Sequence, residues 1–305
     1  MKKNRVTKLL LALGITVYML EGLTGCSNAD AVSKQKIMQA LVKENKSART
    51  SSVTGQDNTT LTGTITMAGS TSMEKFANAL AESFMMKYPD VTVTVEFTGS
   101  SAGIESVLAG SADIGNSSRA LRSEEKSSGA VENIVAIDGI AVITDTSNAV
   151  AALSTEQLNG IYIGEIRNWS EAGGDDVPIV VVGREAGSGT RDTFEELLEI
   201  KDMCAYANEL NSVGAVLARV ASTPGAIGYV SLDVLDDTVQ TISIDGATPA
   251  EENIKDGGYL LSRPFVMVTN GAMEAQSEAV QEMFTYLKSE EGQELIKAVG
   301  LIVPD

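Results

Sequence analysis

From residue 61 to the C-terminus, short runs of β-forming residues alternate with segments of helical periodicity. Apolar residues spaced i, i+3, i+4 indicate helices, and short apolar or alternating runs between turn residues indicate strands. The predicted strands are 63–69, 91–97, 132–144, 178–183, 226–232, 238–244 and 264–269, and the predicted helices are 72–87, 102–109, 154–162, 190–200, 212–222, 274–288 and 290–298. This alternation predicts an α/β fold with mixed sheets flanked by helices.

Three predicted strand-to-helix junctions share one chemistry: GSTS at 69–72, GSS at 99–101 and GSGT at 187–190. Hydroxyl side chains at such positions cap helices, which explains any one of them. A helix N-terminus also offers free N–H groups and a partial positive charge, and glycine lets an anion come close to the backbone. Three such junctions in one chain favour convergence on one small anion. Arg184 adds a planar cation suited to an oxyanion, with a structural salt bridge as the alternative.

The composition excludes several kinds of site. The chain has no histidine, so Gly99–Gly103, which fits the G-x-S-x-G pattern, cannot belong to a Ser-His-Asp triad. Only two cysteines and no histidine leave no ligand set for zinc, and GREAGSGT lacks the lysine of a P-loop. A net charge of −18 disfavours nucleic acid. We therefore predict no catalytic residue, no cofactor and no metal.

Several segments together resemble one known family: AGSTSMEKFANALAESF, FTGSSAGIESVLAGSADIGNSSRAL, AIDGIAVI, LNGIYIGEIRNWSE, VGREAGSGTRDTF and PGAIGYVSL. They are similar to the phosphate-binding lipoproteins of phosphate-specific ABC importers. The resemblance implies a two-lobe clamshell of the type II periplasmic-binding-protein kind, with inorganic phosphate in the cleft. It also implies that phosphate is delivered to membrane permease and ATPase subunits. We expect a monomer that is not an enzyme, because the site collects donors without a nucleophile and a base.

The resemblance implies a set of phosphate-binding residues in both lobes: Ser70, Thr71, Ser72, Ser100, Arg184, Ser188, Gly189 and Thr190. Some members carry an aspartate, which accepts the phosphate proton, where this chain has Ser118. Asp138 is then the candidate acceptor, or else a polar residue at a strand end. A buried carboxylate would disfavour sulfate, which has no proton to donate. Arg119 is expected either to pair with Asp138 or to touch the ligand.

We expect the first lobe to comprise 61–143 and 264–305, and the second lobe to comprise 144–263. The chain would cross between the lobes near 142–147 and again near 261–269.

The N-terminal region has the pattern of an exported lipoprotein. Basic residues precede an apolar run of signal-peptide length, and LTGC at 23–26 resembles a lipobox. We expect residues 1–25 to be removed, Cys26 to be lipidated, and 26–60 to form a flexible spacer with a short helix at 34–45. An ordinary secretory signal is the alternative. The mature chain would carry a net charge of −21, and Cys204 would be a buried structural thiol without a disulfide partner.

Three other functions stay open at this point. The anion could be sulfate, molybdate or tungstate. A secreted hydrolase could use Ser101 or Ser188. The clamshell could also serve adhesion or signalling without transport.

Overall fold

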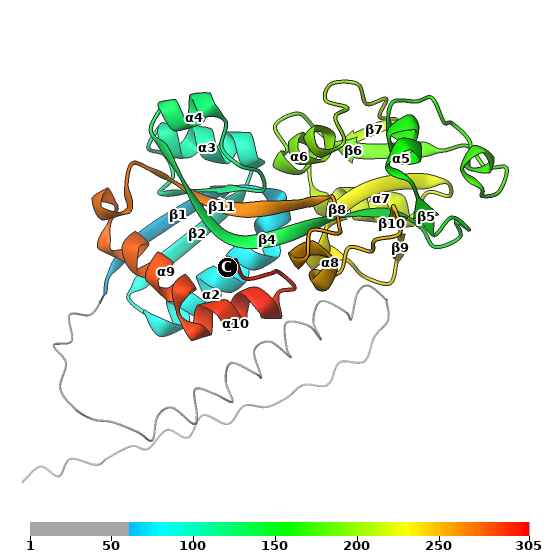
Figure 1. Cartoon of the computed structure of the whole chain (residues 1–305). Helices are drawn as coiled ribbons and strands as arrows, with labels where there is room; N and C mark the ends of the chain where they lie inside the picture. The colour runs from blue at the N-terminus through cyan, green and yellow to red at the C-terminus, as the bar shows by residue number, and fades with distance from the viewer. Residues whose placement is uncertain (1–60, 305) are drawn as a thin grey trace, which may run out of the picture. The chain divides into compact units, whose positions relative to one another are not determined.

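A computed structural model describes residues 61–304 (Figure 1). Within them, nine strands form one mixed sheet in the order β2-β1-β3-β11-β4-β8-β6-β7, with β9 paired to β4. Strands β5 and β10 form a separate parallel pair. The predictions for the signal peptide, Cys26, the spacer and the helix at 34–45 lie outside the described residues. In the described part, no helix has both the length and the apolar character needed to cross a membrane.

The first lobe has helices on both faces of its part of the sheet (Figure 1). Its elements are β1 (Gly63–Gly69), η1 (Thr71–Met73), α2 (Glu74–Lys87), β2 (Val91–Phe97), α3 (Ser100–Leu108), β3 (Ile114–Ser117), α4 (Ser123–Ser127), β4 (Ala130–Asp145), β11 (Ser262–Asn270), η4 (Met273–Ala275), α9 (Glu278–Lys288) and α10 (Glu290–Ala298). Helices α2, α9 and α10 bury one face of the sheet, with Phe76, Phe84 and Met283 fully enclosed. Helix α3 covers the opposite face through Ile104, which packs against Val266.

The second lobe is built in the same way around the other end of the sheet. Its elements are β5 (Ala152–Leu153), α5 (Thr155–Tyr162), η2 (Trp169–Ala172), β6 (Val180–Arg184), α6 (Gly189–Leu197), β7 (Asn208–Leu210), α7 (Val213–Ala221), β8 (Ala226–Ser231), η3 (Leu232–Val234), β9 (Val239–Thr241), β10 (Ser243–Ile244) and α8 (Glu251–Lys255). Helix α7 packs Val216 and Val220 on one face. On the other face, Phe194 stacks on Tyr229 with ring centroids 4.2 Å apart.

Strands β4 and β11 connect the two lobes (Figure 1). Strand β4 pairs with β11 through Gly139 and with β8 from Ile140 onward. Ile140 and Val142 accordingly pack in a second-lobe core. The sheet partner of β4 therefore changes between Gly139 and Ile140. Strand β11 begins at Ser262 and pairs there with Gly139 of β4.

Two predicted elements are divided in the structure. The predicted strand 238–244 is two short strands that belong to different sheets, because β9 pairs with β4 and β10 with β5. The predicted helix 274–288 begins only at Glu278, because the Ser277 side chain accepts the N–H of Val280 and caps the helix there.

Candidate functional site

Four helix N-termini meet between the two lobes, namely those of α2 with its leading turn η1, α3, α6 and α7. The N–H of Val213, the first residue of α7, donates to Thr71 Oγ1 at 3.3 Å. The N–H of Ser101 in α3 donates to the Gly187 carbonyl at 3.1 Å. First-turn N–H groups have no partner within their own helix, so this region gathers donors and partial positive charge.

Buried hydroxyl groups from both lobes contact one another at this point. We call Ser70, Ser72, Ser100, Ser118 and Thr190 the hydroxyl cluster; no member is more than 3% exposed. Ser72 Oγ and Thr190 Oγ1 are 2.7 Å apart, and Ser70 Oγ donates to Ser118 Oγ at 2.9 Å. Ser118 Oγ also lies 3.3 Å from Ser100 Oγ and 3.5 Å from Thr190 Oγ1. These predicted site residues therefore converge in one cluster.

Gly189 lies next to Thr190 and against this cluster. A Cβ atom at this position would lie 2.4 Å from Ser100 Oγ and 2.9 Å from Ser118 Oγ, closer than atoms can approach. The backbone of α6 therefore contacts the hydroxyl cluster directly. Ser188 is also buried, and its Oγ accepts the N–H of Arg191, so its side chain caps α6.

Arg184 ends β6 and is 1% exposed. Its Nε donates to the Leu210 carbonyl at 3.0 Å and its Nη2 to the Asn211 carbonyl at 3.2 Å. Among residues 61–304 no carboxylate lies within ion-pair distance of it, so the salt bridge considered above is not formed. Burial lowers the pKa of Arg184 to about 10, and the charge of Arg263 acts in the same direction. The guanidinium still carries its charge at neutral pH.

Asp138 is not brought into the hydroxyl cluster by any contact. Its Oδ2 accepts from Arg263 Nη2 at 2.8 Å and from Arg263 Nε at 3.0 Å, and its Oδ1 accepts from the Leu232 N–H at 3.2 Å. Arg263 Nη1 in turn donates to the Ser118 carbonyl at 3.3 Å. Asp138 therefore neutralises Arg263, and Arg263 in turn donates to the backbone of Ser118, a member of the cluster.

Arg119 does not pair with Asp138, which was one of its two expected roles. Its guanidinium pairs with Glu125 at 2.7 Å and with Asp192 of the second lobe at 3.1 Å. Its Nη2 also donates to Ser101 Oγ at 3.3 Å. The neighbouring Arg122 reaches Asp192 at 2.5 Å. These contacts place Arg119 in an ion-pair network at the boundary between the lobes.

The sequence did not single out Val213, Arg263 or Asp192. Ser212, the first residue of the predicted helix 212–222, was a signal for a fourth junction, because a capping serine marks a helix start. Arg263 is buried in the second crossing, where a charged residue needs a partner. Nothing in the sequence indicates that Asp192 faces two arginines from residues 119–122.

The structure gives no support to a hydrolase. Ser101 Oγ accepts from Arg119, and Ser188 Oγ accepts a backbone N–H. In residues 61–304, no group of three or more acidic or cysteine side chains is placed to hold a metal ion. Cys204 is half-buried against a second-lobe core rather than fully buried, and burial raises the pKa of its thiol to about 11.

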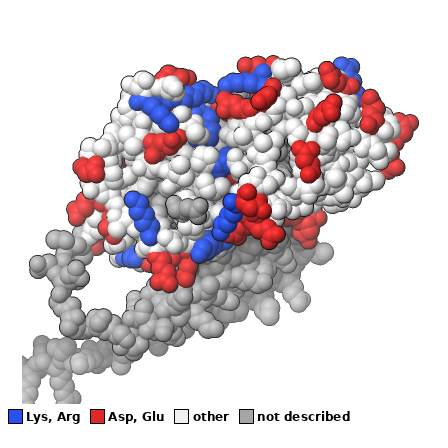
Figure 2. Space-filling view, viewed as in Figure 1, with Lys and Arg blue, Asp and Glu red and all other residues white. Residues whose placement is uncertain are grey.

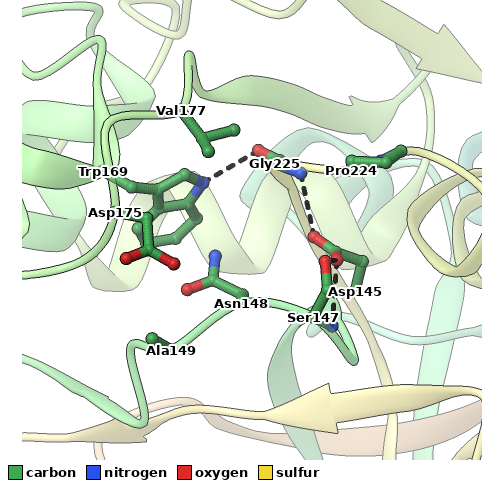
Figure 3. A pocket seen from close by; sticks show the side chains of 9 residues that line it. All are labelled: Asp145, Ser147, Asn148, Ala149, Trp169, Asp175, Val177, Pro224 and Gly225. Carbon is green, nitrogen blue, oxygen red and sulfur yellow. Dashed lines mark hydrogen bonds between the residues drawn. The ribbon is translucent and has the colours of Figure 1, made fainter.

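A separate pocket of about 50 Å³ lies within the second lobe (Figure 3). Asp145 accepts the N–H of Gly225 there at 2.9 Å, and Trp169 Nε1 donates to the Gly225 carbonyl at 3.0 Å. A space of this size holds only a few water molecules. The pocket contains none of the predicted anion-binding residues.

The family model described as PBP superfamily domain matches residues 54–291. The Phosphate-binding protein PstS of Bacillus subtilis is 34% identical over 301 residues, which are 97% of this chain and 92% of that protein. A protein of the same name from Borreliella burgdorferi is 27% identical over 78% of this chain and 89% of its own.

Two solved structures have similar folds. A putative phosphate ABC transporter substrate-binding protein from Clostridium perfringens, solved with bound phosphate, has a TM-score of 0.76 and 39% identity, and covers 80% of this chain and 100% of its own. An ABC-type phosphate transport receptor from Vibrio cholerae has a TM-score of 0.67 and 37% identity, with 79% and 100% covered. The resemblance found in the sequence is thereby confirmed, and this chain belongs to the PBP superfamily, together with the PstS phosphate-binding proteins.

Proposed function

We propose that this protein binds inorganic phosphate between its lobes and delivers it to the permease and ATPase subunits of an ABC importer. The observation that carries the proposal is the buried hydroxyl cluster, which joins both lobes at four helix N-termini. Arg184, which has no carboxylate partner in the described residues, donates to the Leu210 and Asn211 carbonyls just before α7. The chain shares its family with proteins named for phosphate binding. We further propose that it acts as a monomer and has no catalytic activity.

An oxyanion would replace the contacts that the hydroxyl groups now make with one another. Ser70, Ser72, Ser100 and Thr190 would each turn their O–H toward an anion oxygen, and the N–H groups of α3 and α6 would add further donors. Thr71 and Ser188 would complete this shell, and Arg184 would supply the positive charge. Neutral dipoles and one buried cation can hold an anion in spite of the acidic surface, which is screened over about 8 Å.

The proton of phosphate needs an acceptor, and the contacts of Asp138 suggest that this residue does not supply it. We propose that the oxygen of Ser118 accepts it, because a hydroxyl group can donate to one partner and accept from another. A hydroxyl can also rotate and donate to an anion that has no proton. Discrimination against sulfate should therefore be weaker than a carboxylate acceptor would give.

Isothermal titration tests this function. A soluble form from Thr60 to Asp305 retains every described core. The Clostridium structure aligns over 100% of its own length with 80% of this chain, so a protein without the N-terminal part has the same extent as that structure. Stripped of anion, it should bind phosphate with a micromolar or lower dissociation constant, since a five-atom ion can gain roughly 7.5 kcal/mol. Stronger binding of sulfate or molybdate would assign another oxyanion. If phosphate, sulfate and molybdate all failed to bind, the four junctions would be only helix caps and the proposal would be refuted.

We also propose that Cys26 carries a lipid that holds the protein on the outer face of the cell membrane. The proposal is supported by the LTGC pattern at 23–26, which follows an apolar run. Cys26→Ser should leave an unprocessed precursor that incorporates no labelled palmitate. Normal labelling and membrane retention of this variant would contradict the anchor and favour an ordinary secretory signal.

A further inference from the structure

An ion-pair network crosses the boundary between the lobes beside the hydroxyl cluster. Asp192, in the first turn of α6 in the second lobe, pairs with Arg122 at 2.5 Å and with Arg119 at 3.1 Å, both from the first lobe. Basic and acidic side chains adjoin one another in the region of α4 and α6 (Figure 2). These two pairs connect the helix that carries Gly189 and Thr190 to the loop that carries Ser118.

The first-lobe side of this network is held in place without Asp192. Glu125 accepts from Arg119 at 2.7 and 2.9 Å, and it also accepts the backbone N–H of Arg122 at 2.7 Å. The Arg119 side chain is only 3% exposed and the Asp192 side chain 15%. A fixed and largely buried partner lowers the entropic cost of the pair and weakens its screening by salt, unlike a pair on an open surface.

The position of Asp192 makes its charge matter for the anion. It lies two residues after Thr190, at the helix end that would face phosphate. A bare carboxylate there would repel an anion, and the two arginines neutralise it only while the lobes are together. The contact therefore favours the closed arrangement at the same place where closure encloses the anion.

Two further contacts cross the boundary beside this network. The Ser101 N–H donates to the Gly187 carbonyl at 3.1 Å, and Thr193 Oγ1 donates to the Ser118 carbonyl at 3.4 Å. Since Thr193 follows Asp192, closure positions the ion pairs and these hydrogen bonds together. Separation of the lobes would break all of them at once.

We infer that Asp192, Arg119 and Arg122 form a latch that holds the lobes closed and slows the release of the bound anion. The part of the inference that concerns anion release rests on the proposed phosphate function. The part that concerns closure of the lobes does not. Asp192 is a positioning residue, because it contacts none of the hydroxyl cluster.

Phosphate binding kinetics of Asp192→Asn test the latch in the soluble form from Thr60. The substitution keeps the shape and removes the charge, so dissociation should become about tenfold faster with a nearly unchanged association rate. Arg122→Met should have less effect in the Asp192→Asn background than alone, since the pair is already broken.

Glu251→Gln is the matched control. It removes the same charge from an exposed pair with Lys255 inside α8 of the second lobe, and it should leave phosphate release unchanged. Equal effects of the two substitutions, or no effect of Asp192→Asn, would overturn the latch.

A second measurement does not depend on phosphate. Spin labels at Ser127→Cys in the first lobe and Ser222→Cys in the second lobe, in a Cys204→Ser background, report the separation of the lobes; both serines are exposed. Asp192→Asn should lengthen and broaden the distance distribution in the anion-free protein. An unchanged distribution would reject the latch even if phosphate binds. A protein that binds no phosphate but opens in this variant would reject the proposed function and keep the latch.

Discussion

Asp138 and Arg263 face each other across β4 and β11, and their side chains form an ion pair of 2.8 Å in which neither is exposed to solvent. The two strands are those that cross between the lobes. Asp138 also accepts the N–H of Leu232 in the second lobe, and Arg263 donates to the Ser118 carbonyl in the first lobe. This single ion pair therefore links both crossings to the loop of the hydroxyl cluster.

Asp138→Asn should lower the free energy of unfolding by about 3 to 5 kcal/mol, because it leaves the charge of Arg263 buried without a counter-charge. Urea denaturation of the soluble form measures this change. The double variant Asp138→Asn with Arg263→Gln should recover part of the loss, since no uncompensated charge remains. A loss below 1 kcal/mol in the single variant would show that the charges are not coupled as the structure indicates.

Arg184→Ala should weaken phosphate binding by about 2 to 4 kcal/mol, the size expected for a charged hydrogen bond to a buried anion. Titration calorimetry provides the measurement. Arg219→Ala is the control, because Arg219 is exposed on α7 and its loss removes the same charge. If Arg184→Ala bound phosphate as tightly as the unsubstituted protein, Arg184 would not be a phosphate-binding residue.

Gly189→Ala should weaken phosphate binding by about 1 to 3 kcal/mol, because the added methyl group would meet Ser100 Oγ and Ser118 Oγ when the lobes come together. The loss should appear in calorimetric affinity, with little change in the thermal stability of the anion-free protein. Gly214→Ala is matched to it, since Gly214 lies in the first turn of α7 with no atom near its Cβ position. Undiminished binding by the Gly189 variant would argue against the close approach of α6.

Asp233 makes stability depend on pH. Both of its carboxylate oxygens are buried without a hydrogen-bond partner in the described residues. Burial, followed by the negative charge of Asp138, raises the pKa of Asp233 to about 7, although Lys75 and Arg263 act against this. Between about pH 4 and pH 7, the folded protein keeps a proton that the unfolded chain has released.

Stability should therefore fall as the pH rises through this window, by at most about 1.4 kcal/mol per pH unit, until the folded pKa is passed. Urea denaturation at pH 5 and at pH 7.5 measures the fall. In Asp233→Asn the part due to this group should vanish, whereas Asp237→Asn, which changes an exposed neighbour, should retain it. An identical pH profile for Asp233→Asn and the unsubstituted protein would exclude Asp233 as its source.

Much of the secondary structure follows from local patterns. The strands 63–69 and 91–97 and the helix 290–298 have the predicted bounds. Their apolar periodicity and their turn or capping residues act within a few positions of the chain. Strand β3 was missed, because its four residues include a glycine and an asparagine and have little strand preference of their own. It forms a strand because β1 and β11 pair with it on both sides.

The sequence by itself determined the alternation of strands and helices and the junctions rich in glycine and hydroxyl groups, since helix starts are decided by nearby side chains. The tertiary structure alone decided the partners of Asp138 and Asp192. Asp138 meets Arg263 from 125 positions further along the chain, and Asp192 meets Arg122 from 70 positions away. Contacts between residues so far apart in the sequence depend on strand order and on how the lobes meet. Periodicity and capping, in contrast, carry information only over the next few residues.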